Sequence, residues 1–166
     1  TKRSKYFNPR KMKEESIRFP FLVLVVGFLS FYQSLNFSVL GVKPNLSLAI
    51  LIAASFFIQD FLECFLLIVF SAFLLKFSTG FPKEILFLTV IAAGLFFLKK
   101  YLPWDALLNN VFLVFIGTLL FYLMLSRDLI LKALFFEEAL LNLALGALFF
   151  AFLSFMWENK GFGPKI

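Results

Sequence analysis

The stretch FYQSLNFSVLGVKPNLSLAILI, residues 31–52, decides how this chain is divided into helices. Three polar residues interrupt the end of an apolar run, at Gln33, Ser34 and Asn36. Gly41 and Pro44 then break the chain, because proline lacks an amide hydrogen and pushes the residue before it out of the helical region. Asn45 follows directly before the next apolar run, where asparagine is a good N-cap. The stretch therefore predicts a membrane hairpin with a patterned turn.

The composition is that of a membrane protein. The chain has 166 residues, is 61% hydrophobic and 16% charged, and has a mean hydropathy of +0.93. A soluble domain with a single core does not need so much apolar surface. The chain has no histidine and one cysteine, Cys64, which argues against a disulfide scaffold, a Cys/His zinc site and histidine-based catalysis.

The net charge of +6 does not indicate a nucleic-acid partner, because most of it lies in the first eighteen residues and near helix ends. Residues 1–18 form a basic tail that contains Lys2, Arg3, Lys5, Arg10, Lys11, Lys13 and Arg18. Such a tail can bind anionic lipid headgroups, at about 1 kcal/mol per basic residue. It can also act only as a topology signal, which is the interpretation we favour.

The first membrane helix is predicted over about residues 19–40, close to the length that spans a bilayer core. Gln33 and Asn36 lie three residues apart and therefore share a face. They suit either a contact with another helix or the outer membrane interface, and the interface is the favoured interpretation.

Residues 46–75 can form one long helix or two short ones. One helix would be about 45 Å long and would place Asp60 and Glu63 near the bilayer centre, at roughly 2.5 to 3.5 kcal/mol each. We predict instead a short hairpin that turns at residues 59–63 and leaves both carboxylates at the interface. In the alternative, Asp60 and Glu63 share one helix face and form an intramembrane ion or proton site.

Three further helices are predicted in the rest of the chain, after a loop at residues 76–83. The first covers about 84–98 and is closed by Lys99, Lys100 and interfacial aromatic residues. The second covers about 106–125, with Asp105 as a cap and with Asn109 and Asn110 as interfacial amides in its first turns.

The last helix covers about 137–157, and the helix dipole favours Glu137 and Glu138 at its start. Asn142 and Gly146 lie four apart on this helix, a small and polar pair that lets helices approach.

Six membrane segments place both termini on the same side. Counting lysine and arginine, that side receives eleven and the opposite side receives five, at Lys43, Lys76, Lys83, Arg127 and Lys132. The bias predicts cytoplasmic termini. We thus expect an all-α polytopic membrane protein with a basic cytoplasmic tail (1–18), a six-helix transmembrane domain (19–157) and a short cytoplasmic C-terminal tail (158–166).

Motifs for catalysis are absent from the sequence. It contains no GxxxxGK[ST], HExxH, GxSxG or CxxC pattern and no internal repeat. The only acid pairs stand at predicted helix ends. We therefore expect a protein that is not an enzyme and that uses no metal or cofactor.

The opening stretch resembles the MreD family of rod shape-determining proteins. Members carry a glutamine in the first helix and then a glycine, a basic or apolar residue, a proline and an aspartate. The corresponding positions here are Gln33, Gly41, Lys43, Pro44 and Asn45, with asparagine in place of aspartate.

The last helix carries the same resemblance, because EALLNLALGALFFAF, residues 138–152, is similar to the family's closing segment, in which an asparagine follows two leucines, as Asn142 does here. The region after residue 60 departs from the family, with Cys64, Ser71 and Lys76 near where glycine, glycine and aspartate are usual.

This resemblance implies a non-catalytic scaffold of the elongation machinery in the bacterial cytoplasmic (inner) membrane. The resemblance implies an MreC-like protein as the partner, and through it MreB and the enzymes of peptidoglycan synthesis. Formation of a homodimer is a further alternative. The implied partner-binding residues are Gln33, Gly41, Lys43, Pro44, Asn45 and Asn142.

The family's fold is like that of the substrate-binding S-components of energy-coupling-factor vitamin transporters, and such an S-component is the alternative function. It would need a polar pocket on the outer side, where this sequence offers Gln33, Asn36, Asn45, Lys76, Ser78 and Thr79.

Overall fold

The chain folds into six α-helices and two short 3-10 helices, with no strand among the residues that the computed structural model describes, which are 9–35, 38, 41–79, 83–125, 127–130 and 132–158. The helices are α1 (Pro9–Ser34), α2 (Leu46–Ser55), α3 (Phe61–Thr79), α4 (Lys83–Leu98), η1 (Lys99–Tyr101), α5 (Ala106–Leu125), η2 (Arg127–Leu129) and α6 (Ala133–Glu158). The all-α prediction with six helices is confirmed. Within the described part of the chain, α5 and residues 133–157 of α6 are long and apolar enough to cross a membrane, by length and composition.

The break inside residues 46–75 is confirmed, because α2 ends at Ser55 and α3 begins at Phe61, but it lies at residues 56–60 rather than at the predicted 59–63. Asp60 lies directly before α3, and its Oδ1 accepts a hydrogen bond from the Leu62 amide at 3.1 Å. Asp60 and Glu63 are both exposed at the start of α3. They therefore do not lie in the middle of one continuous helix.

The predicted bounds of the first helix are wrong at both ends. It begins at Pro9 rather than near residue 19, so part of the tail is helical. Proline at the first helical position is favourable, and the lysines, glutamates and methionine that follow are good helix formers. The helix ends at Ser34, where the Ser34 hydroxyl donates to the Phe31 carbonyl oxygen at 2.6 Å and competes with the helical pattern. Asn36 lies outside the described residues.

Two other boundaries differ from the prediction. The α3 helix continues to Thr79, so the predicted loop at residues 76–83 is partly helical. The α6 helix begins at Ala133, which places Glu137 and Glu138 in its second turn instead of its first. Alanine, leucine and phenylalanine at 133–136 continue the apolar pattern toward the N-terminus, and no proline or glycine stops it.

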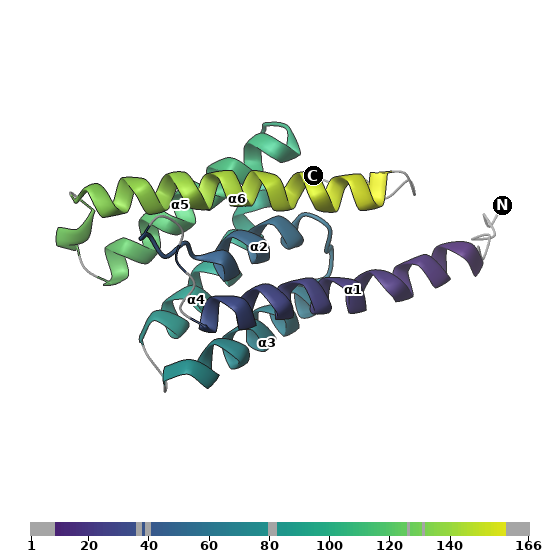
Figure 1. The fold of residues 1–166 in the computed structure, drawn as a ribbon. Coiled ribbons are helices and arrows are strands. Elements are labelled where there is room, and N and C mark those ends of the chain that lie inside the picture. The colour runs from purple at the N-terminus through teal and green to yellow at the C-terminus, as the bar shows by residue number, and fades with distance from the viewer. Residues whose placement is uncertain are drawn as a thin grey trace.

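The short helix α2 occupies the centre of the bundle. All ten of its residues are buried, and it contacts each of the other five α-helices. Figure 1 shows α2 between α1 and α6, with the N-terminal end of α1, the connection from α2 to α3 and the C-terminal end of α6 toward one end of the bundle. A helix that is apolar all round belongs in a protein interior, which explains this position.

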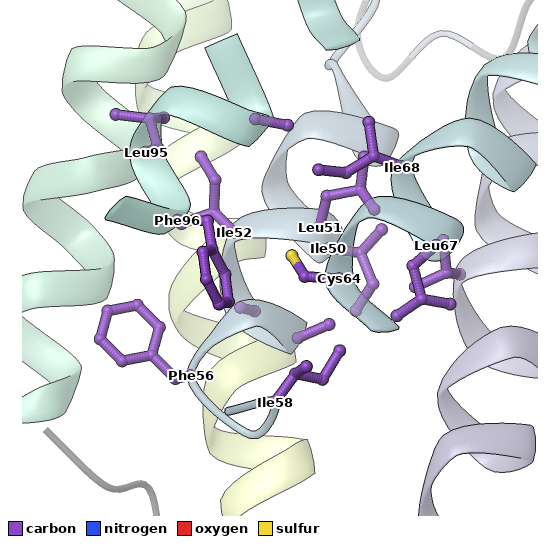
Figure 2. Packing of buried hydrophobic residues seen from close by; sticks show 14 of the residues in the cluster. Ile50, Leu51, Ile52, Phe56, Ile58, Cys64, Leu67, Ile68, Leu95 and Phe96 are labelled. Carbon is purple, nitrogen blue, oxygen red and sulfur yellow. The ribbon is translucent and has the colours of Figure 1, made fainter. Parts of the chain in front are cut away.

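The main hydrophobic core forms where α2 packs against its neighbours. Figure 2 shows Ile50, Leu51 and Ile52 of α2 close to side chains from α3 and α4. Cys64 lies in this cluster as a buried free thiol. The core therefore joins the two segments that the break at residues 56–60 separates.

The outside of the bundle is rich in large apolar side chains. Leu24, Leu140 and Phe155 are 71%, 69% and 69% exposed. The interior holds a set of buried polar residues, which are Ser30, Asn45, Ser47, Ser55, Ser71, Lys99, Asn109, Asn110, Thr118 and Asn142. The core itself is mostly apolar, but the large exposed apolar side chains and the buried polar residues differ from a typical soluble protein, in which serine, asparagine and lysine are mostly exposed.

Gly146 lets α6 approach α5 closely, as the sequence predicted for the pair Asn142 and Gly146. A Cβ atom added at Gly146 would lie 2.8 Å from Cγ2 of Val114 on α5. The Asn110 side-chain amide donates to the Gly146 carbonyl oxygen at 3.0 Å across the same contact. The small residue thus permits both the packing and the hydrogen bond.

Replacing Gly146 with alanine is expected to lower the free energy of unfolding by about 1 to 2 kcal/mol, because the stiff Val114 side chain cannot move aside cheaply. Gly94 is the matched control, since it is an exposed helical glycine with nothing within 4 Å of an added Cβ. Gly94→Ala should raise stability by about 0.5 to 1 kcal/mol. Thermal unfolding followed by circular dichroism measures both, and equal stabilisation by the two substitutions would contradict the close approach.

Candidate functional site

Asn45, directly before α2, takes part in three hydrogen bonds that hold this segment in place. The Asn45 Oδ1 atom accepts from the Leu48 amide at 3.1 Å, which confirms the predicted N-cap. The backbone amide of Asn45 donates to Oδ1 of Asn142 on α6 at 2.8 Å. The Gln33 side chain of α1 donates to Asn45 Oδ1 at 3.4 Å. Asn45 therefore ties the start of α2 to the first and last helices.

A chain of serine hydroxyl groups continues from this point into the bundle. Oε1 of Gln33 accepts from the Ser47 amide at 2.7 Å. The Ser47 hydroxyl donates to the Ser30 oxygen at 3.1 Å, and the Ser30 and Ser71 oxygens are 2.7 Å apart. These contacts join α1, α2 and α3 through hydrogen bonds between polar side chains and backbone inside the bundle.

Asn142 extends the same system to α5. Its Nδ2 atom donates to the Thr118 hydroxyl oxygen at 3.2 Å. One turn earlier on α6, Glu138 accepts a hydrogen bond from the Tyr122 hydroxyl. We refer to Ser30, Gln33, Asn45, Ser47, Ser71, Thr118 and Asn142 as the Asn45 network.

The structure brings together three of the six residues that the sequence singled out, Gln33, Asn45 and Asn142. Pro44 is buried beside them, whereas Gly41 and Lys43 are exposed. Gly41 has a φ of +84°, a conformation that residues with a side chain rarely adopt. Asn45 and Asn142 are 5% and 1% exposed, so their amides are used inside the bundle to position the loop.

Lys99 is a second polar centre. The sequence analysis assigned it only to the positive charge that closes a membrane helix. Its Nζ atom donates to the carbonyl oxygens of Ser55 and Ile58, at 2.9 Å for Ile58. It also lies 4.1 Å from the centre of the Phe96 ring. A cation at a helix C-terminus is favourable, and here it satisfies carbonyl groups where α2 ends. Burial lowers the pKa of Lys99 from 10.5 to about 8.

Sequence alone could not separate Lys99 from its neighbour Lys100, which is exposed. Both follow the apolar run of α4 and both suit an interfacial position. Only the contact between η1 and the end of α2 assigns one of them to the interior.

Asn109 and Asn110 are not interfacial amides as predicted, because both are fully buried. The Asn109 side chain donates to the Trp104 carbonyl oxygen at 2.8 Å and so fixes the chain leading into α5. Asn110 holds α6 through Gly146. The Oδ1 atoms of both have no hydrogen-bond partner among the described residues.

A shallow apolar groove of about 380 Å³ lies beside α5. Its lining residues are Trp104, Leu108, Val111, Phe112, Phe115 and Leu143.

The described residues contain no group of three or more His, Cys, Asp or Glu that could hold a metal ion. The arrangement of polar side chains is thus suited to holding helices and one loop in place.

In comparisons with known proteins, no protein-family model, no curated protein and no solved structure matches this chain.

Proposed function

We propose that this protein is an integral membrane scaffold that crosses the bilayer with six segments and holds another membrane protein through its first loop. The observation that carries the proposal is the exposed apolar surface of the bundle, at Leu24, Leu140 and Phe155, together with the buried hydrogen bonds of the Asn45 network. Lipid is the solvent in which such a surface is favourable. Buried hydrogen bonds then hold helices together where the hydrophobic effect between them is weak.

The α2 segment is compatible with this placement although it has ten residues, about 15 Å of helix. The residues on both sides of it, 42, 44, 45 and 56–58, are also buried. Irregular backbone at membrane depth is tolerated where protein surrounds it. Lys99 and the Asn45 network supply hydrogen bonds at the two ends of this segment, where the helix leaves backbone groups without partners.

The orientation follows from the charge distribution. The basic residues at the start of α1 and the pair Lys99 and Lys100 belong to one side, and Lys43, Lys83 and Lys132 belong to the other. The excess of lysine and arginine supports cytoplasmic termini. The first loop, with Gly41 and Lys43 exposed, then faces the outer side of a bacterial cytoplasmic membrane.

The partner is proposed from the resemblance to MreD proteins. Of the residues that carry this resemblance, Gln33, Asn45 and Asn142 meet in one hydrogen-bonded system. This system fixes a loop whose exposed positions can contact a partner. We propose an MreC-like membrane-anchored protein as that partner, linking the scaffold to MreB and to peptidoglycan synthesis.

Crosslinking from the first loop tests this function. A photoreactive amino acid at Lys43 in native membranes is expected to capture an MreC-like protein, because Lys43 is exposed beside the fixed Asn45 segment. The same probe at Lys83, exposed at the start of α4, is the matched control and should capture much less.

Two results would contradict the proposal. Equal capture of the MreC-like protein from Lys43 and Lys83 would show that the first loop is not the binding site. Recovery of paired ATPases with a coupling membrane subunit would identify a transporter S-component instead.

A further inference from the structure

The apolar groove beside α5 starts at an interfacial tryptophan. Trp104, in the segment that leads into α5, lines this end of the groove and is 46% exposed. Its ring meets the Phe112 ring in an edge-on contact, with 5.2 Å between the ring centres, so the indole forms part of the groove wall. Tryptophan is favoured at membrane interfaces, where one end of the side chain is in apolar surroundings and the other is in water. This end of the groove therefore suits the boundary between lipid tails and headgroups.

The length of the groove matches the depth of one lipid leaflet. Its lining follows one face of α5 from Trp104 to Phe115, and α5 rises by about 14 Å between its first residue and Phe115. Half of a hydrocarbon core that is about 30 Å thick is about 15 Å. Leu143 of α6 also lines the groove, and it follows Asn142, whose hydrogen bond to Thr118 places Leu143 toward the Phe115 end. The groove thus has the length needed to extend from the interface to about the middle of a bilayer.

Two exposed charges of opposite sign, Lys100 and Asp105, lie in the segment that contains Trp104. The Lys100 amine lies 5.7 Å from the centre of the Phe96 ring, and Asp105 directly precedes α5. A lysine complements a phosphate and a carboxylate complements an ammonium group, because both pairs form charge-assisted hydrogen bonds. The two charges therefore match a zwitterionic headgroup that contains an amine better than an anionic headgroup, which Asp105 would repel.

We propose that the groove binds one acyl chain of phosphatidylethanolamine from the cytoplasmic leaflet, with the headgroup phosphate at Lys100 and the headgroup ammonium at Asp105. This inference rests on the membrane placement and orientation proposed above, because acyl chains reach the groove only within a bilayer. The six lining residues are all apolar or aromatic, as an acyl chain requires.

The size of the groove favours a lipid chain over a helix of a partner protein. A transmembrane helix is about 10 to 12 Å wide with its side chains and fills roughly 1,100 to 1,600 Å³ over a length of about 14 Å. This is several times the volume of the groove, which is about 380 Å³. The groove therefore fits a single chain and not a helix.

Native mass spectrometry of the full chain in mild detergent tests the headgroup. The purified protein is mixed with equal amounts of phosphatidylethanolamine and phosphatidylglycerol that have the same acyl chains. The first lipid retained should be phosphatidylethanolamine, with a preference of about two- to fivefold, the effect of one exposed ion pair. Asp105→Asn keeps the shape of the side chain and should reduce this ratio to about one. Glu63→Gln, at an exposed carboxylate near the start of α3, is the matched control and should keep the preference.

A second pair of variants tests the acyl chain. Val111→Phe places a larger side chain in the groove and should lower retention of the first lipid, of either kind, by about threefold or more. Leu140→Phe enlarges a residue of α6 that is 69% exposed and does not line the groove, so retention should not change. If Val111→Phe does not fold, which circular dichroism detects, Asp105→Asn still tests the site because Asp105 is exposed.

Several results would overturn the lipid site. These are equal retention of the two lipids by the wild-type protein, an unchanged preference in Asp105→Asn, and the same lipid retention in Val111→Phe and Leu140→Phe. Lipid retention needs no MreC-like partner, and partner capture from Lys43 needs no bound lipid. A chain that stays in solution without detergent contradicts the membrane placement itself, whereas a chain that needs detergent and shows no preference contradicts only the lipid site.

Discussion

Replacing Asn142 with leucine is expected to lower the free energy of unfolding by roughly 2 to 4 kcal/mol. Leucine has the same branching as asparagine but offers no polar atom. The Asn45 amide, which donates to Asn142 Oδ1 at 2.8 Å, would be left buried without an acceptor. The Thr118 hydroxyl would lose its donor as well. An unsatisfied buried group costs more than the mean value of a hydrogen bond, because its desolvation is no longer offset.

The measurement is the apparent melting temperature in detergent, which should fall by about 6 to 12 °C for a chain of this size. Thr118→Val is the matched control, since it removes only the hydroxyl group and keeps the shape. It should cost about 1 kcal/mol. If Asn142→Leu is no more destabilising than Thr118→Val, the hydrogen bond to the Asn45 backbone does not fix the first loop.

Replacing Lys99 with methionine is expected to lower the free energy of unfolding by roughly 2 to 3 kcal/mol. The Ile58 carbonyl oxygen would lose the donor that now lies at 2.9 Å, and the cation above the Phe96 ring would disappear. Methionine keeps the apolar stem of the side chain, so the change reports mainly on the amine. Lys100→Met makes the same change of charge at an exposed position and should alter stability by less than about 0.5 kcal/mol.

The pH dependence of this site has a defined sign. The folded pKa of Lys99 is about 8, whereas its ordinary value is 10.5, because burial disfavours the charged amine. Between these values the unfolded chain binds more protons than the folded one, so stability rises with pH. The wild-type protein should gain roughly 1 to 2 kcal/mol between about pH 7.5 and 9.5 relative to Lys99→Met. Parallel curves for the two proteins would show that Lys99 titrates normally.

The Asn45 network and Lys99 hold the two ends of α2 in place. At its N-terminal end the Asn45 network connects the segment to α1, α5 and α6. At its C-terminal end Lys99 connects it to η1. A helix of ten residues is too short to be stable alone and depends on such contacts with its surroundings. The exposed loop at Gly41 and Lys43 is thereby attached to the buried centre of the bundle, which is what the proposed scaffold function requires of a binding loop.

The sequence by itself determined the number of helices and the local features of the first loop. Pro44 breaks the chain without help from the rest of the fold, and Asn45 caps the helix that begins one residue later. The charge of Asp60 and Glu63 predicted the break before α3, since two carboxylates are too costly inside an apolar run. These are local effects that depend on neighbouring residues in the chain.

Only the tertiary structure decided which polar side chains are buried and with which partners. Asn45 and Asn142 are 97 positions apart, and Lys99 and Ser55 are 44 apart, so no local pattern relates them. The sequence predicted Asn109 and Asn110 to be interfacial. They are buried because α5 packs against α6 and against the segment that precedes α5. Amides and lysines suit both a membrane interface and a protein interior. The choice between the two depends on the partner that the packing of distant helices supplies.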